Sequence, residues 1–306
     1  MREGEFCMVY NSYYGAWRRW VGILYWIMFF LPTIVVYPKE AVIQLKQGNL
    51  ALPGSQQPNP IIAFGQNIVD KHDRQIFADF ALVKGAGKSF TIAMPAFLYG
   101  ISDTVSILCS LPIASQKLKQ DHASGVGDFF VQGEYEFYAK LKESLTDQAT
   151  VVGTLILPTG SGSKNPNTGL GSPGFFLGAT LSRTTIDWYF FASPGVVITT
   201  TNNERKYGNQ YLLQCGIGRN IPSPSGTIIA GMVELCGLFV QPNTTYGIIN
   251  TDDSAINAGV YCTPSLWFSS EKFIVQAGIG FPLFQETSDG QVPNDYSVAV
   301  NCGVKF

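Results

Sequence analysis

Charged side chains are scarce in this chain of 306 residues, since Asp, Glu, Lys and Arg make up only 14% of it, against roughly 25% in ordinary soluble domains. The formal net charge is -2, so there is no basic excess of the kind that marks a nucleic-acid partner. Aromatic residues reach 13%, which excludes a disordered chain. With apolar residues at 46%, so few charges would not cover the surface of a soluble globule.

Long apolar runs are also nearly absent. A transmembrane helix needs about 20 consecutive apolar residues, and a single candidate run extends from Trp20 to Tyr37. A bundle of membrane helices is therefore excluded. The class that matches is a chain whose apolar residues alternate with polar ones, as in transmembrane β-barrels.

The single apolar run predicts an export signal. Arg18 and Arg19 precede it, and basic residues followed by an apolar stretch are typical of a secretory signal peptide. We expect residues 1–41 to form this signal, with Met1 and Met8 both open as starting residues and the cleavage site undecided. The alternative is a permanent membrane anchor.

Beyond the signal, the side chains alternate between apolar and polar with the period of a β-strand. In the last segment, Val298 and Val300 fall on one face while Ser297 and Asn301 fall on the other, because successive side chains of a strand point to opposite faces. This alternation predicts about twelve strands, at residues 75–83, 89–99, 104–112, 126–139, 149–158, 174–182, 187–199, 208–218, 226–239, 258–269, 272–283 and 295–306.

The connections between these segments are alternately compact and long, except that the first one, around residues 84–88, is short where a long one is due. Residues 183–186 form a compact one, whereas residues 160–173 and 241–257 form long polar ones. Short turns at one rim and long loops at the other are typical of outer-membrane barrels. A soluble β-sandwich shows the same alternation along its strands but has no reason to sort its loops. We therefore predict an all-β fold, a transmembrane antiparallel β-barrel over residues 75–306.

Several short motifs of the chain stand in one order. They are Pro95, Tyr99-Gly100-Ile101-Ser102-Asp103, Leu111-Pro112, Gly125-Val126-Gly127-Asp128, Tyr135-Glu136-Phe137, Leu157-Pro158-Thr159-Gly160 and Gly169-Leu170-Gly171-Ser172. This order resembles the outer-membrane β-barrel transporters of the phenol meta-pathway type. The resemblance implies an outer-membrane location in a Gram-negative bacterium and uptake of hydrophobic or aromatic compounds. It also implies that the terminal Phe306 is recognised by the barrel assembly machinery.

Alternation also assigns side chains to the interior of the barrel. Acidic residues outnumber basic ones there, so a hydrated lumen would attract cations, as rings of Asp or Glu do in cation-selective pores. The alternative is that the basic residues neutralise the acids and the cluster braces the barrel. The candidates for the lumen are Asp79, Asp128, Gln132, Glu134, Glu136, Glu234, Lys272 and Lys305.

Residues that could carry chemistry are few. His122 and Ser124 have the His-x-Ser spacing of outer-membrane phospholipase, and residues two apart on a strand share a face. No Asn-Gly-Arg follows them, and His122 falls in a stretch that we expect to be a polar loop. The six cysteines contain no Cys-x-x-Cys, so we expect no metal and no cofactor. Strand parity places Cys236 inside and the other barrel cysteines toward lipid, which predicts no disulfide; these others are Cys109, Cys215, Cys262 and Cys302.

Function follows from the expected size of the barrel. Eight strands are filled by side chains and sixteen leave an open channel, so about twelve predict a narrow passage for a small solute. Residues 42–74, rich in Gln, Asn and Pro, are expected to form a periplasmic lead-in or a partial plug. One alternative is a structural or surface-binding barrel, and a minor one is a phospholipase-like hydrolase. Outer-membrane lipid, the assembly machinery and a small solute are the expected partners.

Overall fold

The computed structural model describes residues 47–62, 64–202, 205–224, 226–245, 248–250, 258–287 and 293–306. The export signal that we predict over residues 1–41 lies outside the described residues. Within them, no helix is both long enough and apolar enough to cross a membrane.

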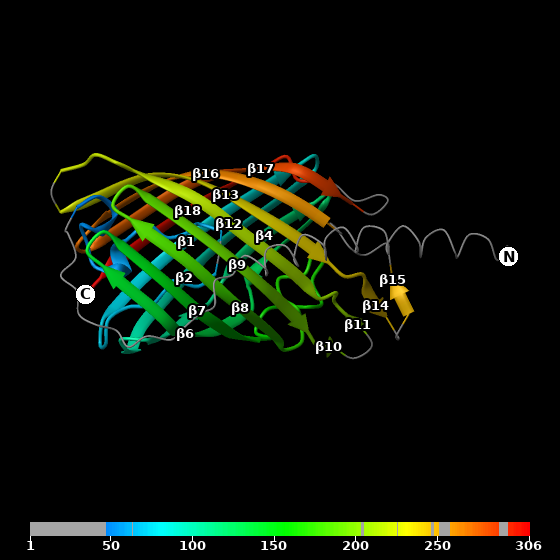
Figure 1. Ribbon diagram of the computed structural model, residues 1–306. Coiled ribbons are helices and arrows are strands. Elements are labelled where there is room, and N and C mark those ends of the chain that lie inside the picture. Colours follow the sequence, from blue (N-terminus) through cyan, green and yellow to red (C-terminus); the bar gives the residue numbers. More distant parts are fainter. Residues whose placement is uncertain are drawn as a thin grey trace, which may run out of the picture. The chain divides into compact units, whose positions relative to one another are not determined.

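A closed wall of twelve antiparallel strands makes up the described structure (Figure 1). The first strand, β1, pairs with β2 along one edge and with the last strand, β18, along the other, so the sheet closes on itself. The wall strands are β1 (Arg74–Gly85), β2 (Lys88–Ser102), β3 (Val105–Ser110), β6 (Phe129–Lys142), β7 (Leu145–Leu157), β8 (Gly174–Thr185), β9 (Trp188–Thr199), β12 (Gln210–Ile221), β13 (Thr227–Val240), β16 (Ala258–Ser270), β17 (Phe273–Glu286) and β18 (Tyr296–Lys305).

Further short strands and two short helices are not among the twelve wall strands. The hairpin of β4 (Ile113–Leu118) and β5 (Asp121–Val126) pairs with β2. A separate small sheet joins β10 (Thr201–Asn202), β11 (Arg205–Lys206), β14 (Asn243–Thr245) and β15 (Ile248–Asn250). Two short 3₁₀ helices, η1 (Gly48–Leu50) and η2 (Gly54–Gln56), precede the first strand.

The two rims of the barrel differ as the sequence predicted. Tight turns join β2 to β3, β6 to β7, β8 to β9 and β16 to β17 at the rim that also carries the C-terminus (Figure 1). Longer connections, including the one that holds β14 and β15, lie at the opposite rim. In an outer-membrane barrel the short-turn rim faces the periplasm, and we name the two rims periplasmic and outer accordingly.

The polarity of the barrel is the reverse of that of a soluble protein. Large apolar side chains on the outer face are exposed, among them Leu177 (60%), Leu266 (62%) and Leu283 (64%). Polar side chains on the inner face are buried, among them Gln276 (1%) and Glu234 (0%). An apolar exterior and a polar interior are the pattern of a barrel that crosses a lipid bilayer.

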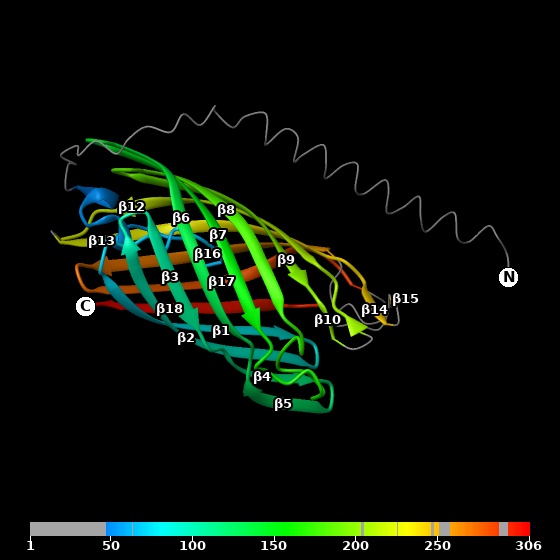
Figure 2. The same cartoon turned by 90° about the horizontal axis from the view of Figure 1, so that it is seen from below.

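The β4–β5 hairpin corrects one expectation, since the sequence predicted a polar loop where these strands lie. β3 pairs with the periplasmic half of β2, and β4 continues along the outer half, from Lys88 to Ala93. The break falls at Leu111 and Pro112, because proline has no N–H to give to the ladder. Beyond it the hairpin projects at the outer rim (Figure 2). Polar residues on both of its faces hid the alternation.

Candidate functional site

The described residues before β1 form an anchor (residues 47–56), a strap inside the barrel (residues 57–62 and 64–69) and a return to β1 (residues 70–73). The anchor lies at the periplasmic end of the barrel (Figure 1). Its Leu52 packs into an apolar core on the inner face of the wall, and the backbone N–H of Asn49 donates to the carbonyl of Ile186 at 2.8 Å. The core residues around Leu52 are Tyr189, Phe191, Ile228, Ala230, Met232, Trp267 and Ile274.

Glu234 on β13 holds the ascending part of the strap. Its carboxylate accepts two consecutive backbone N–H groups, from Ile61 at 2.9 Å and from Ile62 at 3.1 Å. The side-chain amide of Gln214 donates to the carbonyl of Ile62. Because charge-assisted hydrogen bonds are stronger than neutral ones, this buried carboxylate is a firm attachment point.

Glu134 on β6 makes the matching contact with the descending part of the strap. Its carboxylate accepts the backbone N–H groups of Gln66 and, at 3.0 Å, of Asn67. Between β13 and β6 the wall contains β12, β9, β8 and β7 on one side, so the two carboxylates lie on roughly opposite walls. The strap therefore crosses the lumen, with Phe64 and Gly65 between the two contacts.

Phe64 sits at the crossing and occupies a notch made by two glycines of the wall. A Cβ atom at Gly178 would lie 2.2 Å from its ring, and one at Gly195 would lie 2.4 Å from it. The ring of Phe176 meets it edge-on, with centroids 4.2 Å apart. The hydroxyl of Thr180 donates to the carbonyl of Phe64 at 2.6 Å, so both the ring and the backbone of this residue are held.

The return to β1 contacts the turn that follows β2. The backbone N–H of Lys71 donates to Asp103 at 3.0 Å, and that of His72 donates to the carbonyl of Gly100 at 2.9 Å. Gly100 is required here because a Cβ atom would lie 2.2 Å from the carbonyl oxygen of Asp70. The hydroxyl of Tyr99 lies 3.0 Å from Nδ1 of His72. Three of the motif residues thus hold the end of the luminal segment.

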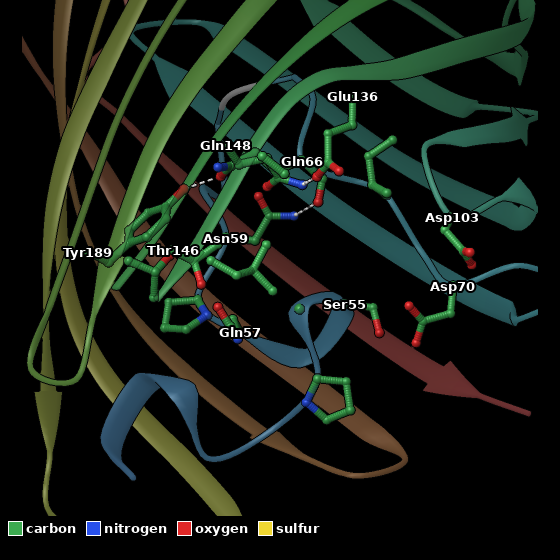
Figure 3. A pocket seen from close by; sticks show the side chains of 17 residues that line it. Ser55, Gln57, Asn59, Gln66, Asp70, Asp103, Glu136, Thr146, Gln148 and Tyr189 are labelled. Carbon is green, nitrogen blue, oxygen red and sulfur yellow. Dashed lines mark hydrogen bonds between the residues drawn. The ribbon is translucent and has the colours of Figure 1, made fainter. Parts of the chain in front are cut away.

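A cavity of about 280 Å³ lies between the strap and the wall (Figure 3). Its lining is acidic and rich in amides and hydroxyls, and no lysine or arginine is among these residues. Tyr189 donates from its hydroxyl to Gln66, which closes one side of the cavity (Figure 3). The polar residues of the lining are Ser55, Gln57, Asn59, Gln66, Asp70, Asp103, Glu136, Thr146, Gln148, Thr184 and Tyr189.

Asp128 corrects the assignment to the open lumen that alternation gave it. It precedes the first residue of β6, where the chain leaves the ladder, so strand parity does not apply. Its carboxylate accepts the backbone N–H groups of Gly160 at 2.9 Å and Leu170 at 2.6 Å. Cβ atoms at Gly160 and Gly169 would lie 2.9 and 2.3 Å from its Oδ1. Asp128 therefore ties down the outer loop between β7 and β8.

The other motif glycines lie near the same loop. Gly127 donates from its backbone to the carbonyl of Pro112 at 2.7 Å. Gly125 lies in β5, next to the position where Lys164 of the loop donates to the carbonyl of Ser124 at 2.8 Å. Pro158 follows the end of β7 and is exposed.

The remaining lumen candidates have contacts of their own on the wall. Asp79 accepts a hydrogen bond from Asn301, Gln132 accepts one from Thr154 at 3.3 Å, and Glu136 accepts one from Gln148. Lys305 forms an ion pair with Asp73 at the periplasmic rim. Lys272 is a correction: it is exposed in the turn between β16 and β17, where parity assigns no face.

The residues suspected of catalysis are not assembled into a triad. His122 lies in β5, and its Nε2 is 3.3 Å from the hydroxyl of Ser115 on β4, not paired with Ser124 in any described contact. Among the described residues, no group of three His, Cys, Asp or Glu could hold a metal ion.

The described cysteines form no disulfide. Cys215 lies opposite Leu235 while Cys236 lies opposite Gln214, so the two thiols are on different faces of the sheet. This agrees with the assignment by parity of Cys236 to the inside.

The partners of the strap and the contacts of Asp128 were missed by sequence reasoning. The strap has no periodicity, and its partners lie up to 173 positions away in the chain. The one signal that could have found the Asp128 contacts is the clustering of glycines around positions 125–128 and 160–171.

A closed barrel with an apolar exterior and a polar interior defines the class of the outer-membrane β-barrels. Within this class, residues 59–232, more than half of the chain, match the family described as "Putative MetA-pathway of phenol degradation", and the protein belongs to this family. The match confirms the resemblance found in the motifs.

Solved structures that resemble this one are distant in sequence. The COG4313 outer membrane channel from Pseudomonas putida F1 superposes with a TM-score of 0.67 at 14% identity, over 82% of this chain and 100% of that chain. The NanC porin gives a TM-score of 0.44 at 13% identity, over 76% of this chain and 98% of that chain. No curated protein matches the sequence.

Proposed function

We propose that this protein is an outer-membrane channel for passive passage of a small solute, and that residues 47–73 form its partial plug. The observation that carries the proposal is the strap, which crosses the lumen between opposite walls and leaves a cavity beside it. A barrel that served only as a scaffold would have no use for a separate segment held by buried carboxylates. The Pseudomonas putida protein with the same fold is named a channel, which supports this function.

The solute that we propose is small and apolar or aromatic, the class that the family's description suggests. The register supports it, because apolar side chains face inward on the outer side of the strap. Phe176 lies opposite Val197, and Leu212 lies opposite Leu238. The cavity on the periplasmic side of the strap is polar, so a solute with an apolar ring and a hydroxyl group would find partners on both sides.

Single-channel recording in planar bilayers tests the proposal. The full protein should give small, mostly closed currents, and a variant lacking residues 47–69 should give larger and lasting ones. Added phenol should block the open current at lower concentrations than glucose does. A deletion variant that assembles and does not conduct would refute the channel.

Two alternatives predict different results. A structural or surface-binding barrel, whose long outer loops bind a partner, would assemble and show no conductance with or without the plug. A hydrolase would cleave phospholipid in a manner abolished by His122→Ala, although the hydrogen bond of His122 to Ser115 leaves Ser124 without activation. We favour a protein without catalytic activity, which inserts with the help of the assembly machinery.

A further inference from the structure

We propose that Glu134 and Glu234 are the two positioning residues that latch the strap, and that opening of the lumen moves the strap while the anchor and the return to β1 stay in place. The inference rests on the proposed function for the meaning of opening. It goes beyond that function by naming the residues that hold the closed state and the segments that stay in place when the lumen opens.

The two contacts share one geometry. In each, both oxygens of one carboxylate accept neighbouring backbone N–H groups of the strap, Ile61 and Ile62 at Glu234 and Gln66 and Asn67 at Glu134. Backbone contacts of this kind do not depend on the side chains of the strap. The wall therefore binds the backbone of the strap and not its side chains. The charge of each carboxylate is balanced by the N–H dipoles of the strap itself.

The burial of the two glutamates determines how they act in the closed and in the open state. Glu134 is 2% exposed and Glu234 is 0% exposed. A carboxylate buried without partners is costly, so each one favours the closed strap for as long as water is excluded. When the strap lifts, water reaches both carboxylates and replaces the lost hydrogen bonds. The same two residues thus stabilise the closed state and tolerate the open one.

The segments on either side of the strap are held by different forces. The anchor buries Leu52 in the apolar core, and the hydroxyl of Ser269 donates to the carbonyl of Gln56 at 2.6 Å. The return is fixed by Asp103 and by the backbone of Gly100. Neither set of contacts involves the two glutamates. Both ends are tethered at the periplasmic rim, so the strap can swing and cannot leave the barrel.

The backbone of the strap is strained at its contact with Glu134. Gly65 and Gln66 have φ values of +87° and +70°. Left-handed conformations are costly for residues other than glycine. Gln66 therefore carries strain that is relieved when the strap is released, whereas His72, with a φ value of +71°, lies in the return and keeps its conformation.

Hydrogen–deuterium exchange of the assembled protein tests the latch. Glutamine keeps the size of glutamate, and its amide nitrogen cannot accept an N–H, so each single variant loses one hydrogen bond of the pair. In Glu134→Gln, in Glu234→Gln and in the double variant, peptides covering residues 58–69 should exchange roughly ten-fold faster or more. Peptides covering 47–56 and 70–73 should keep the wild-type rate.

Asp79→Asn is the matched control. It removes a carboxylate from the same lumen, and the hydrogen bond of Asp79 goes to Asn301 on the wall rather than to the strap. Exchange of the strap should be unchanged in this variant. Equal acceleration in the control, unchanged exchange in the double variant, or acceleration that includes residues 47–56 would each overturn the latch.

Conductance separates this inference from the proposed function. Assembly of each variant is judged by heat-modifiable gel mobility. If the double variant fails to assemble, the two single variants are measured in its place. Faster exchange of the strap supports the latch even if no variant conducts, and in that case only the channel fails. Larger currents with unchanged exchange would support the channel and refute the latch.

Discussion

The notch that receives Phe64 allows the plug to be displaced without touching a charged group. We predict that Gly178→Ala and Gly195→Ala each release the strap. The new methyl group of Gly178→Ala would lie 2.2 Å from Cε2 of Phe64 and 2.8 Å from Cζ of Phe176. Carbon atoms pack at roughly 3.5–4.0 Å, so the Phe64 ring has to retreat by about 1.3 Å or more.

The size of the effect follows from what the retreat removes. The ring of Phe176 meets the Phe64 ring edge-on, at 4.2 Å between centroids, and itself lies 2.8 Å from the new methyl group at Gly178, so the notch has no room for both rings and the methyl group. Withdrawing a fully buried phenylalanine side chain costs about 1.5–3 kcal/mol, and Phe64 is half-buried, so the lower end of this range is the limit for its ring. A loss of about 1.5 kcal/mol raises the fraction of molecules with a released strap by up to roughly ten-fold.

Open probability in single-channel recordings measures this fraction. Gly178→Ala and Gly195→Ala should open more often than the wild type, and Phe64→Ala should do the same because it removes the ring itself. Gly153→Ala on β7 is the control, since its new Cβ atom would meet nothing within 4 Å. If both notch variants assemble and match the control in open probability, Phe64 does not hold the strap and the reasoning is wrong.

Four further predictions concern other parts of the molecule. Deleting Phe306 should lower the amount of assembled barrel seen by heat-modifiable mobility, because it ends the closing strand and donates from its backbone to Arg74 at 3.0 Å; normal assembly would contradict this role. Asp128→Ala should make the outer loop near Gly160 sensitive to added protease on whole cells, since it removes two charge-assisted hydrogen bonds worth about 1.5–3 kcal/mol each; a loop as resistant as in the wild type would count against it. Glu136→Gln should weaken cation preference in reversal-potential measurements with asymmetric salt, and an unchanged potential would show that this carboxylate does not set selectivity. Mass spectrometry of the alkylated, non-reduced protein should find every mature cysteine modified, and any cross-linked cysteine pair would disprove the strand registers.

Strand positions were predictable because lipid imposes a strict rule on each residue of the wall. In β18 the valines alternate with Asn301 and Ser297 without a break, and the structure places the strand where this alternation does. The rule weakens where the barrel leaves the membrane. Ser115, Gln116 and Lys117 are all polar. The two faces of β4 therefore do not differ in polarity, and no alternation predicts this strand.

The site was predictable only in part, since parity gives the face of a residue and not its partner. Glu134 and Glu234 were assigned inward, and they lie inward on nearly opposite walls. The composition of residues 42–74 left a periplasmic lead-in and a partial plug both open. The strap has no period, so nothing local indicated which carboxylates it would bind. Asp128 shows the limit of parity, because one residue outside the ladder is enough to turn a side chain from the lumen to a loop.

The route of residues 47–73 has a consequence for how the protein is built. Ile61 reaches Glu234 across 173 positions of the chain, and β1, which follows the strap, pairs with the last strand, β18. The strap cannot find its carboxylate until β13 stands in the wall, and it cannot be enclosed until β1 and β18 meet. The strap, which is synthesised before every strand of the barrel wall, is therefore among the last segments to reach its final contacts, and the barrel is closed and filled in the same late stage of folding.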